Sequence, residues 1–192
     1  MNKIATIAGL AVAATAMSAS ADVLLNVDLS VVDTITITAT AGLSSADTFG
    51  GDGTGVYLAE IFSTLFTDGI SDSLVSGDLV ANGDSSDGSP NLFTRSAGGF
   101  GLNIYSWTND PVSNFVTGTT AFVGSATWTL DSADYADLLA GNSSGDIYAF
   151  ADSDDDIAPG GIPIIGQWNV VPAPGAMALL GLGGIVAGRR RR

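Results

Sequence analysis

The chain has 192 residues, of which 20 are acidic and 6 are basic, and its formal net charge at pH 7 is −14. It contains no histidine and no cysteine, which excludes Ser-His-Asp and Cys-His nucleophile arrangements, zinc sites built from imidazole or thiolate, and disulfide bonds. Between residues 22 and 170 the one basic side chain is Arg95, so this part has 20 carboxylates against one guanidinium, a net charge of −19. Nucleic acid and anionic membrane surfaces are therefore poor partners for it.

The first 21 residues have the order of features that defines a secretory signal peptide. Lys3 supplies a positive start, residues 4–17 are apolar, and Ala19 and Ala21 form an A-x-A cleavage site. We expect this segment to form a signal helix and the mature chain to begin at Asp22. The protein is therefore predicted to be exported.

Residues 22–170 are predicted to form one domain, because roughly 150 residues are enough to bury a hydrophobic core. Every acidic residue except Glu60 is an aspartate, and aspartate combined with Gly, Ser and Thr is typical of turns and strand ends. The chain also has 3 Trp, 4 Tyr and 8 Phe, which argues against disorder. This composition favours a β-rich globular domain.

Residues 34–41 alternate threonine with isoleucine or alanine, which predicts a half-buried strand with Thr34, Thr36, Thr38 and Thr40 on one face. Gly-, Asn-, Asp- and Ser-rich segments separate the other candidate strands. These further strands are predicted at residues 23–31, 57–62, 92–95, 102–107, 121–130, 146–151 and 164–171.

One helix is predicted before Gly141, with Asp131 or Ser132 as its N-terminal cap. A second helical turn over residues 58–66 competes with the strand at 57–62. The predicted fold class is all-β: a single antiparallel β-sandwich, jelly-roll-like, with one or two short helices. It is flanked by the N-terminal signal helix and by a C-terminal transmembrane helix.

Residues 171–192 consist of a proline-containing motif, an apolar segment at 175–188, and a basic end. The motif is Val171, Pro172, Ala173 and Pro174, and the basic end is Arg189, Arg190, Arg191 and Arg192. As a helix the apolar segment would be about 21 Å long, against a hydrocarbon core of about 30 Å. The arginines are expected to remain cytoplasmic as a stop signal, with the preceding chain outside. Such a short helix suits temporary retention better than permanent anchorage.

This tail resembles the PEP-CTERM sorting signal of Gram-negative bacteria, with Ala173 at the position where that motif has glutamate. The resemblance covers residues 171–192 alone. It implies that an exosortase-type enzyme recognises and processes the tail while the protein passes through the inner membrane. The expected destination is then the cell surface or the extracellular matrix.

Asp152, Asp154 and Asp156 alternate as in the first half of an EF-hand loop, and carboxylate oxygens are ligands that calcium prefers. Ile157 and Pro163 stand where such a loop needs glycine and glutamate. A weak calcium site and a solvated acidic loop therefore both stay open, and no other cofactor is expected. A second acidic segment, at 84–88, lacks the alternating spacing.

The predicted function is structural or adhesive and not enzymatic, with extracellular polysaccharide as a partner. Because like charges repel, calcium is the simplest bridge between the aspartates and an anionic polymer. One alternative is sugar binding, in which Tyr105 and Trp107 stack on sugar rings. Another is a glycan hydrolase or lyase that uses aspartate carboxylates.

A third alternative is ice binding. The threonine row at residues 34–40 could extend to a neighbouring strand and form a flat array of hydroxyl groups. Solvent-facing threonine on an ordinary antiparallel strand explains the same pattern. The residues that would join the row are Ser125, Thr127 and Thr129.

Overall fold

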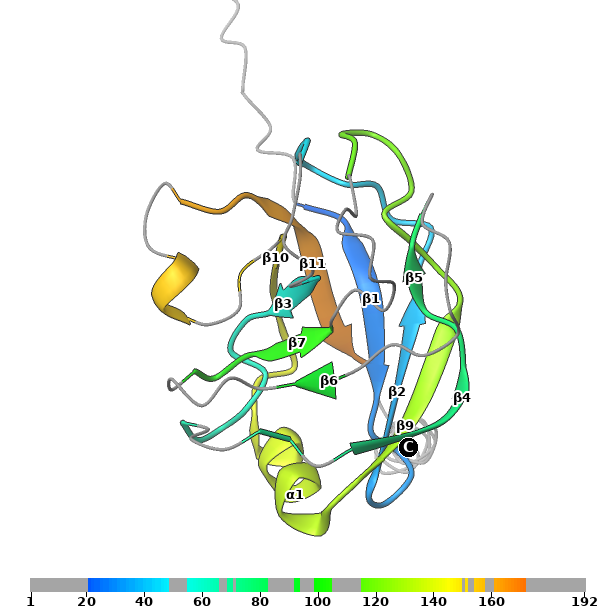
Figure 1. The fold of residues 1–192 in the computed structure, drawn as a ribbon, viewed down its shortest axis with the longest axis vertical. Helices are drawn as coiled ribbons and strands as arrows, with labels where there is room; N and C mark the ends of the chain where they lie inside the picture. Colours follow the sequence, from blue (N-terminus) through cyan, green and yellow to red (C-terminus); the bar gives the residue numbers. More distant parts are fainter. Residues whose placement is uncertain are drawn as a thin grey trace, which may run out of the picture.

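The computed structural model describes residues 21–48, 55–65, 69–70, 72–82, 92–93, 99–104, 115–149, 151, 154–157 and 161–171. Within these ranges the fold is mostly β, with eleven strands, one α-helix and one 3-10 helix (Figure 1). The predicted signal helix and C-terminal transmembrane helix lie outside the described residues. In the described part of the chain, no helix is long and apolar enough to cross a membrane.

Nine of the strands form one sheet in the order β4-β9-β2-β1-β11-β10-β3-β7-β6, and the remaining two, β5 and β8, pair with each other. The strands are β1 (Val23–Asp28), β2 (Thr34–Ala39), β3 (Val56–Leu58), β4 (Asp72–Gly77), β5 (Val80–Ala81), β6 (Leu92–Phe93), β7 (Leu102–Ile104), β8 (Phe122–Val123), β9 (Ser125–Leu130), β10 (Ser144–Ala149) and β11 (Ile164–Val170).

The sheet is mixed, and the sequence prediction of a purely antiparallel arrangement is wrong at one pair. Strands β1 and β11 run parallel, with Val27 opposite Val170. The other pairs among the described strands are antiparallel. Parallel neighbours need a long connection, and here nearly the whole domain separates the first strand from the last. The final strand can therefore return beside β1 in the same direction.

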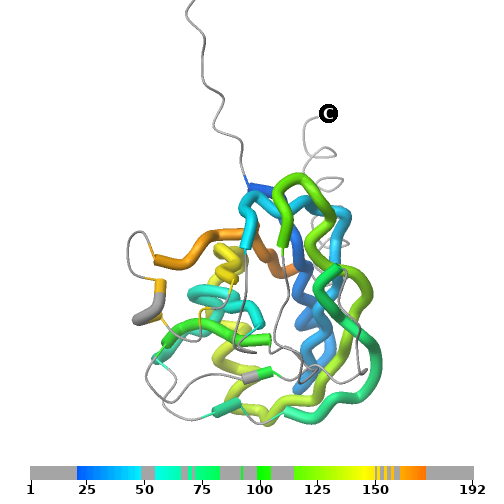
Figure 2. The backbone as a smooth tube through the Cα atoms, turned by 45° about the horizontal axis from the view of Figure 1, so that its top comes forward, coloured from blue at the N-terminus to red at the C-terminus, as the bar shows by residue number. Residues whose placement is uncertain are grey.

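The large sheet curls around a single apolar core. Strands β1, β2, β4 and β9 stand on one side, and β3, β7 and β10 stand on the other (Figures 1 and 2). The edge strands β4 and β6 approach each other, because the Leu92 backbone N–H lies near enough to the Asp72 carboxylate to favour its charged form. Trp128 of β9 and Trp168 of β11 are completely buried inside the curl. Their burial attaches β9 and β11 to the same core.

The local patterns explain the best predicted elements. In β2, Ile35 and Ile37 are fully buried while the threonines lie on the opposite face, which confirms the half-buried strand. The strand predicted at residues 121–130 is divided into β8 and β9 at Gly124, which has a positive φ of 84°. A Cβ atom at this position would lie 1.9 Å from the Asp78 backbone oxygen, so only glycine fits the break.

Helix α1 (Ser132–Ala140) confirms the predicted helix and its ends. Asp131 Oδ1 accepts hydrogen bonds from the backbone N–H groups of Ala133 and Asp134, both at 2.9 Å. The Gly141 N–H donates to the Leu138 carbonyl at the other end. The competing helical turn is not formed within the described residues 58–65, where β3 ends at Leu58 and a turn follows.

A second, smaller apolar cluster lies outside the main core. Tyr57, Ala59 and Ala151 are buried in it, and Tyr148, Ile157 and Ile162 pack against them. The 3-10 helix η1 (Asp154–Ile157) contributes Ile157, so the chain after β10 covers the outer side of β3 and β10. This cover holds the loop that carries Asp154 against the sheet.

Candidate functional site

Two neighbouring strands place hydroxyl side chains in facing pairs on the outer side of the sheet. The register sets Thr34 opposite Thr129 and Thr36 opposite Thr127, and it sets Thr38 opposite Ser125. The Oγ1 atoms of Thr36 and Thr127 lie 2.8 Å apart and share a hydrogen bond. The predicted extension of the threonine row to a neighbouring strand is therefore confirmed. We call this set the hydroxyl face: Thr34, Thr36, Thr38, Ser125, Thr127 and Thr129.

The hydroxyl face continues into polar side chains on both sides. On β4, Ser73 and Ser76 are paired with Thr129 and Thr127. On β1, Asn26 is paired with Thr38, and its other neighbour is Asn169 of β11. The Asn169 Oδ1 atom is buried and accepts no hydrogen bond. Polar side chains thus accompany the hydroxyl face on neighbouring strands, from β4 to β11.

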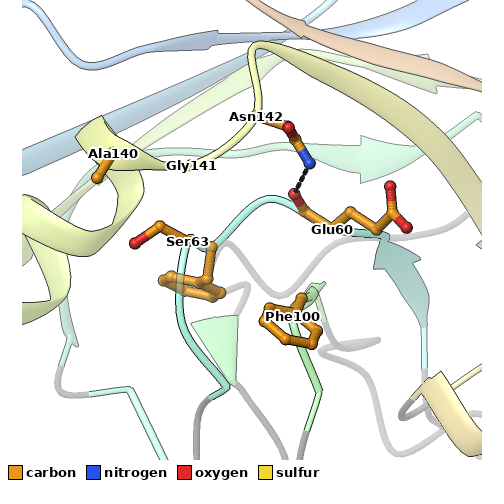
Figure 3. Close-up of a pocket in the computed structure, with 7 residues that line it drawn as sticks. Glu60, Ser63, Phe100, Ala140, Gly141 and Asn142 are labelled. Carbon is orange, nitrogen blue, oxygen red and sulfur yellow. Dashed lines mark hydrogen bonds between the residues drawn. The ribbon is translucent and has the colours of Figure 1, made fainter.

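A cavity of about 400 Å³ lies between the end of α1 and the turn that follows β3 (Figure 3). Its wall combines two phenyl rings, a carboxylate, a carboxamide and a hydroxyl. The Asn142 carboxamide approaches the Glu60 backbone from one side, and the Phe100 ring lies on the other side (Figure 3). The lining residues are Glu60, Phe62, Ser63, Phe100, Ala140, Gly141 and Asn142.

Hydrogen bonds from several elements fix the backbone around this cavity. Glu60 has a φ of 58°, a left-handed conformation that is strained for a residue with a side chain. Its carbonyl accepts from Asn142 Nδ2 at 2.9 Å, and the preceding Ala59 N–H donates to the Asp146 carbonyl at 3.0 Å. The Phe62 N–H donates to the Phe100 carbonyl at 2.8 Å. These contacts hold the strained turn in place.

The surroundings of the cavity are acidic. Ser63 Oγ donates to Asp137 Oδ1, and Thr64 Oγ1 donates to Asp137 Oδ2 at 2.9 Å. Burial raises the pKa of the nearby Tyr148 hydroxyl, and the negative charges of Asp146 and Glu60 raise it further. The described residues include no lysine or arginine, so within them no basic side chain offsets these charges.

The predicted sorting residues lie almost entirely outside the described residues. Ala19, Pro172, Ala173, Pro174 and Arg189 to Arg192 are not among them. Val171 is described, and its N–H donates to the Val27 carbonyl at 2.8 Å. At the other end, Asp22 Oδ2 accepts from the Leu43 N–H at 2.9 Å. The predicted start of the mature chain and the last residue before the prolines therefore both contact the folded domain.

Of the three candidate calcium ligands, the structure describes the side chain of Asp154 alone, because Asp152 and the Asp156 side chain lie outside the described set. Asp154 Oδ1 accepts from the Tyr57 hydroxyl at 2.6 Å, and Oδ2 accepts from the Phe100 N–H at 2.9 Å. Among described residues, no group of three or more acidic side chains is placed to hold a metal ion. The calcium site stays a prediction. Tyr105, Trp107 and residues 84–88 also lie outside these ranges.

Sequence reasoning missed the cavity, because Glu60, Phe100 and Asn142 come from three separate parts of the chain. The signal that could have drawn attention to it is Glu60, the one glutamate in the sequence. No family model matches the chain, and no curated protein or solved structure is significantly similar to it.

Proposed function

We propose that the protein is an exported, non-catalytic structural or adhesive component of the cell surface or extracellular matrix of a Gram-negative bacterium. An exosortase-type enzyme processes its tail during passage through the inner membrane. The support for this route is the signal peptide order at residues 1–21 and the PEP-CTERM-like order at 171–192. The domain between them is a sandwich-like, jelly-roll-like variant in which two sides of one curled sheet enclose the core.

The observation that carries the adhesive role is the hydroxyl face. Paired strands repeat its side chains about 4.8 Å apart between strands and about 6.8 Å apart along each strand. The Thr34 and Thr129 hydroxyls donate to backbone carbonyls, and Thr36 and Thr127 share one hydrogen bond, so these oxygens mainly accept hydrogen bonds from the hydroxyl groups of a polysaccharide. A repetitive polar surface suits an extended polymer better than a compact small molecule.

The charge of the domain restricts the polymer that can bind directly. With a net charge of −19 for residues 22–170, an anionic polysaccharide is repelled unless a divalent cation bridges the two. Neutral segments of an extracellular polysaccharide can approach without such a bridge. Calcium at the predicted aspartate loop would serve the anionic case, and no other cofactor is proposed.

The test is binding of purified matrix polysaccharide by the full chain and by the double variant Thr36→Val and Thr127→Val. Valine keeps the branched shape and removes both hydroxyls from the middle of the face, so binding should weaken about tenfold, the effect of roughly 1.4 kcal/mol. Thr117→Val, in the exposed turn after Phe115, is the control and should leave polysaccharide binding unchanged. Equal binding by all three proteins would contradict the assignment, and release of cleaved sugar would contradict the non-catalytic role.

The export route has a separate test, the mass of the native protein recovered from cells. Cleavage after Ala21 and near Pro172 to Pro174 should each remove the corresponding end. A full-length mass, with both ends retained, would contradict processing.

Ice binding is the second candidate function, and the facing register of Thr36 with Thr127 favours it. The same regular array could order water in an ice-like lattice. A bulky Thr36→Tyr variant should abolish inhibition of ice recrystallisation, whereas Thr117→Tyr should not. If the wild-type protein leaves ice recrystallisation unchanged, this candidate is excluded.

A further inference from the structure

The polar side chains of the cavity beside α1 present mainly hydrogen-bond acceptors. Glu60 contributes a carboxylate on an exposed residue. Asn142 uses its Nδ2 group on the Glu60 carbonyl, which leaves its Oδ1 as an acceptor. Ser63 directs its hydroxyl proton to Asp137, so its oxygen can only accept from a bound molecule. A complementary group must therefore supply donors, which excludes a carboxylate or phosphate.

The aromatic part of the wall adds a second requirement. The Phe100 side chain is 37% exposed although Phe62 next to it is buried. An exposed phenyl face attracts the carbon face of a sugar ring and, more strongly, a nearby cation. Together with the Glu60 carboxylate, the ring defines a place for a positively charged group that carries an apolar face.

The backbone at Glu60 supports a role for its side chain beyond the fold. Its left-handed φ of 58° would suit glycine without strain, yet the chain has a long charged residue there. Neighbouring contacts over-determine this conformation, among them the hydrogen bonds of Ala59 and Asn142. Strain of this kind concentrates where a side chain must be presented at a binding site.

We infer that this cavity binds an amino-sugar residue with an unmodified ammonium group, carried by an extracellular polymer. The ammonium group donates to the Glu60 carboxylate and to Asn142 Oδ1, and the pyranose ring lies against Phe100. The volume of about 400 Å³ is at the small end of the range for small-molecule sites, about 300–1,000 Å³. A sugar ring uses this space, whereas a lysine ammonium on a thin alkyl stem leaves most of it empty.

Electrostatics favours the same class of polymer. Residues 22–170 carry a net charge of −19, which attracts a polycation and repels a polyanion at distances up to the screening length. The inference takes its biological setting from the proposed role at an extracellular polymer. The cavity and the hydroxyl face are different surfaces, so an experiment can exclude the binding role of one without excluding that of the other.

The experiment is calorimetric titration of the full chain with glucosamine tetramer and with N-acetylglucosamine tetramer in 0.15 M salt. The two sugars share their rings and differ in charge, so the acetylated tetramer should bind at least about tenfold more weakly. Glu60→Gln and Phe100→Ala should each weaken glucosamine binding by about tenfold or more. Asp33→Asn removes one charge in the β1–β2 turn, where asparagine tolerates the φ of 53°, and should change binding less than about twofold.

Three outcomes would overturn the inference. Equal binding of the two tetramers means that the ammonium group is not recognised. An equal loss in Asp33→Asn and Glu60→Gln means that the whole field of the domain attracts the sugar, without a site. Tight binding of trilysine with the same dependence on Glu60 means that the cavity recognises a basic peptide. In each case, Thr36→Val with Thr127→Val still tests the polysaccharide role through the hydroxyl face.

Discussion

The Tyr57 hydroxyl donates a hydrogen bond of 2.6 Å to Asp154 Oδ1 and thereby joins strand β3 to helix η1. Tyr57 is 1% exposed, so its hydroxyl is shielded from water. The other carboxylate oxygen of Asp154 accepts from the Phe100 N–H at 2.9 Å. One carboxylate therefore connects the outer apolar cluster to the residue that forms the aromatic wall of the cavity.

Tyr57→Phe should lower the free energy of unfolding by about 1.5–3 kcal/mol, because the lost hydrogen bond has a charged acceptor. Urea unfolding followed by tryptophan fluorescence measures this change. Tyr135→Phe is the matched control, since the Tyr135 hydroxyl donates to the neutral Leu29 carbonyl at 2.7 Å. Tyr135→Phe should lower the free energy of unfolding by about 1 kcal/mol. Equal losses in the two variants would show that the Asp154 charge adds nothing.

The same contact predicts a loss of stability in alkali. Burial raises the pKa of Tyr57 above its ordinary value of 10.0, and the hydrogen bond and charge of Asp154 raise it further. The unfolded chain releases this proton from about pH 10 upward while the folded chain retains it, so folding becomes less favourable as the pH rises. The Tm of the wild type should therefore fall above pH 10 more steeply than that of Tyr57→Phe. Parallel pH profiles would contradict the buried, neutral Tyr57.

The strand and the helix that were predicted well are determined by residues that are close together in the sequence. Threonine alternation was enough to orient β2, and Asp131 with Gly141 was enough to bound α1. Strand β4 was missed because its residues are largely exposed at a sheet edge and its sequence does not alternate apolar with polar residues. The parallel pairing of β1 with β11 was also missed, since no local pattern records which strands become neighbours.

The candidate sites also differ in whether they depend on residues near in the sequence or on distant ones. The facing hydroxyls of β2 and β9 could be anticipated because each strand alternates by itself. The role of Asp154 could not, because its partner Tyr57 is distant in the sequence and spacing alone suggested a calcium ligand. The conformation of Glu60 also has no sequence signature, since it results from contacts with β10 and with Asn142.

Asp72→Asn should stabilise the protein at neutral pH. Burial raises the pKa of Asp72 above 3.8, the largest effect there, and the Leu92 N–H opposes it by stabilising the charged form. The folded state thus favours the protonated carboxyl of Asp72. The stability that this protonated carboxyl contributes is fully present below pH 3.8 and is lost as the pH rises. Asparagine stays neutral and can still accept from Leu92, so its Tm should exceed that of the wild type at pH 7. The difference should shrink in acid.

Asp47→Asn should have the opposite sign and serves as the comparison for Asp72→Asn. Hydrogen bonds from the backbone and side chain of Thr117 lower the pKa of Asp47 below 3.8. Its contribution to stability is therefore present above pH 3.8 and is lost as the pH falls. The variant should have a lower Tm than the wild type at pH 7 and the same Tm well below pH 3. Two variants with Tm shifts of the same sign at pH 7 would contradict these pKa directions.

Gly141→Ala should destabilise the protein by about 1–3 kcal/mol, the usual cost of overpacking. A Cβ atom at Gly141 would lie 1.9 Å from the Ile61 backbone oxygen, which cannot move without displacing the turn at Glu60.

Gly118→Ala separates this clash from backbone strain, because Gly118 has a φ of 78° and no atom within 4 Å of its Cβ position. Gly118→Ala should cost about 1–2 kcal/mol through strain alone and leave glucosamine binding unchanged. Because Gly141 lines the cavity, Gly141→Ala should weaken glucosamine binding as well, and normal binding by that variant would show that the Glu60 turn does not depend on this close contact.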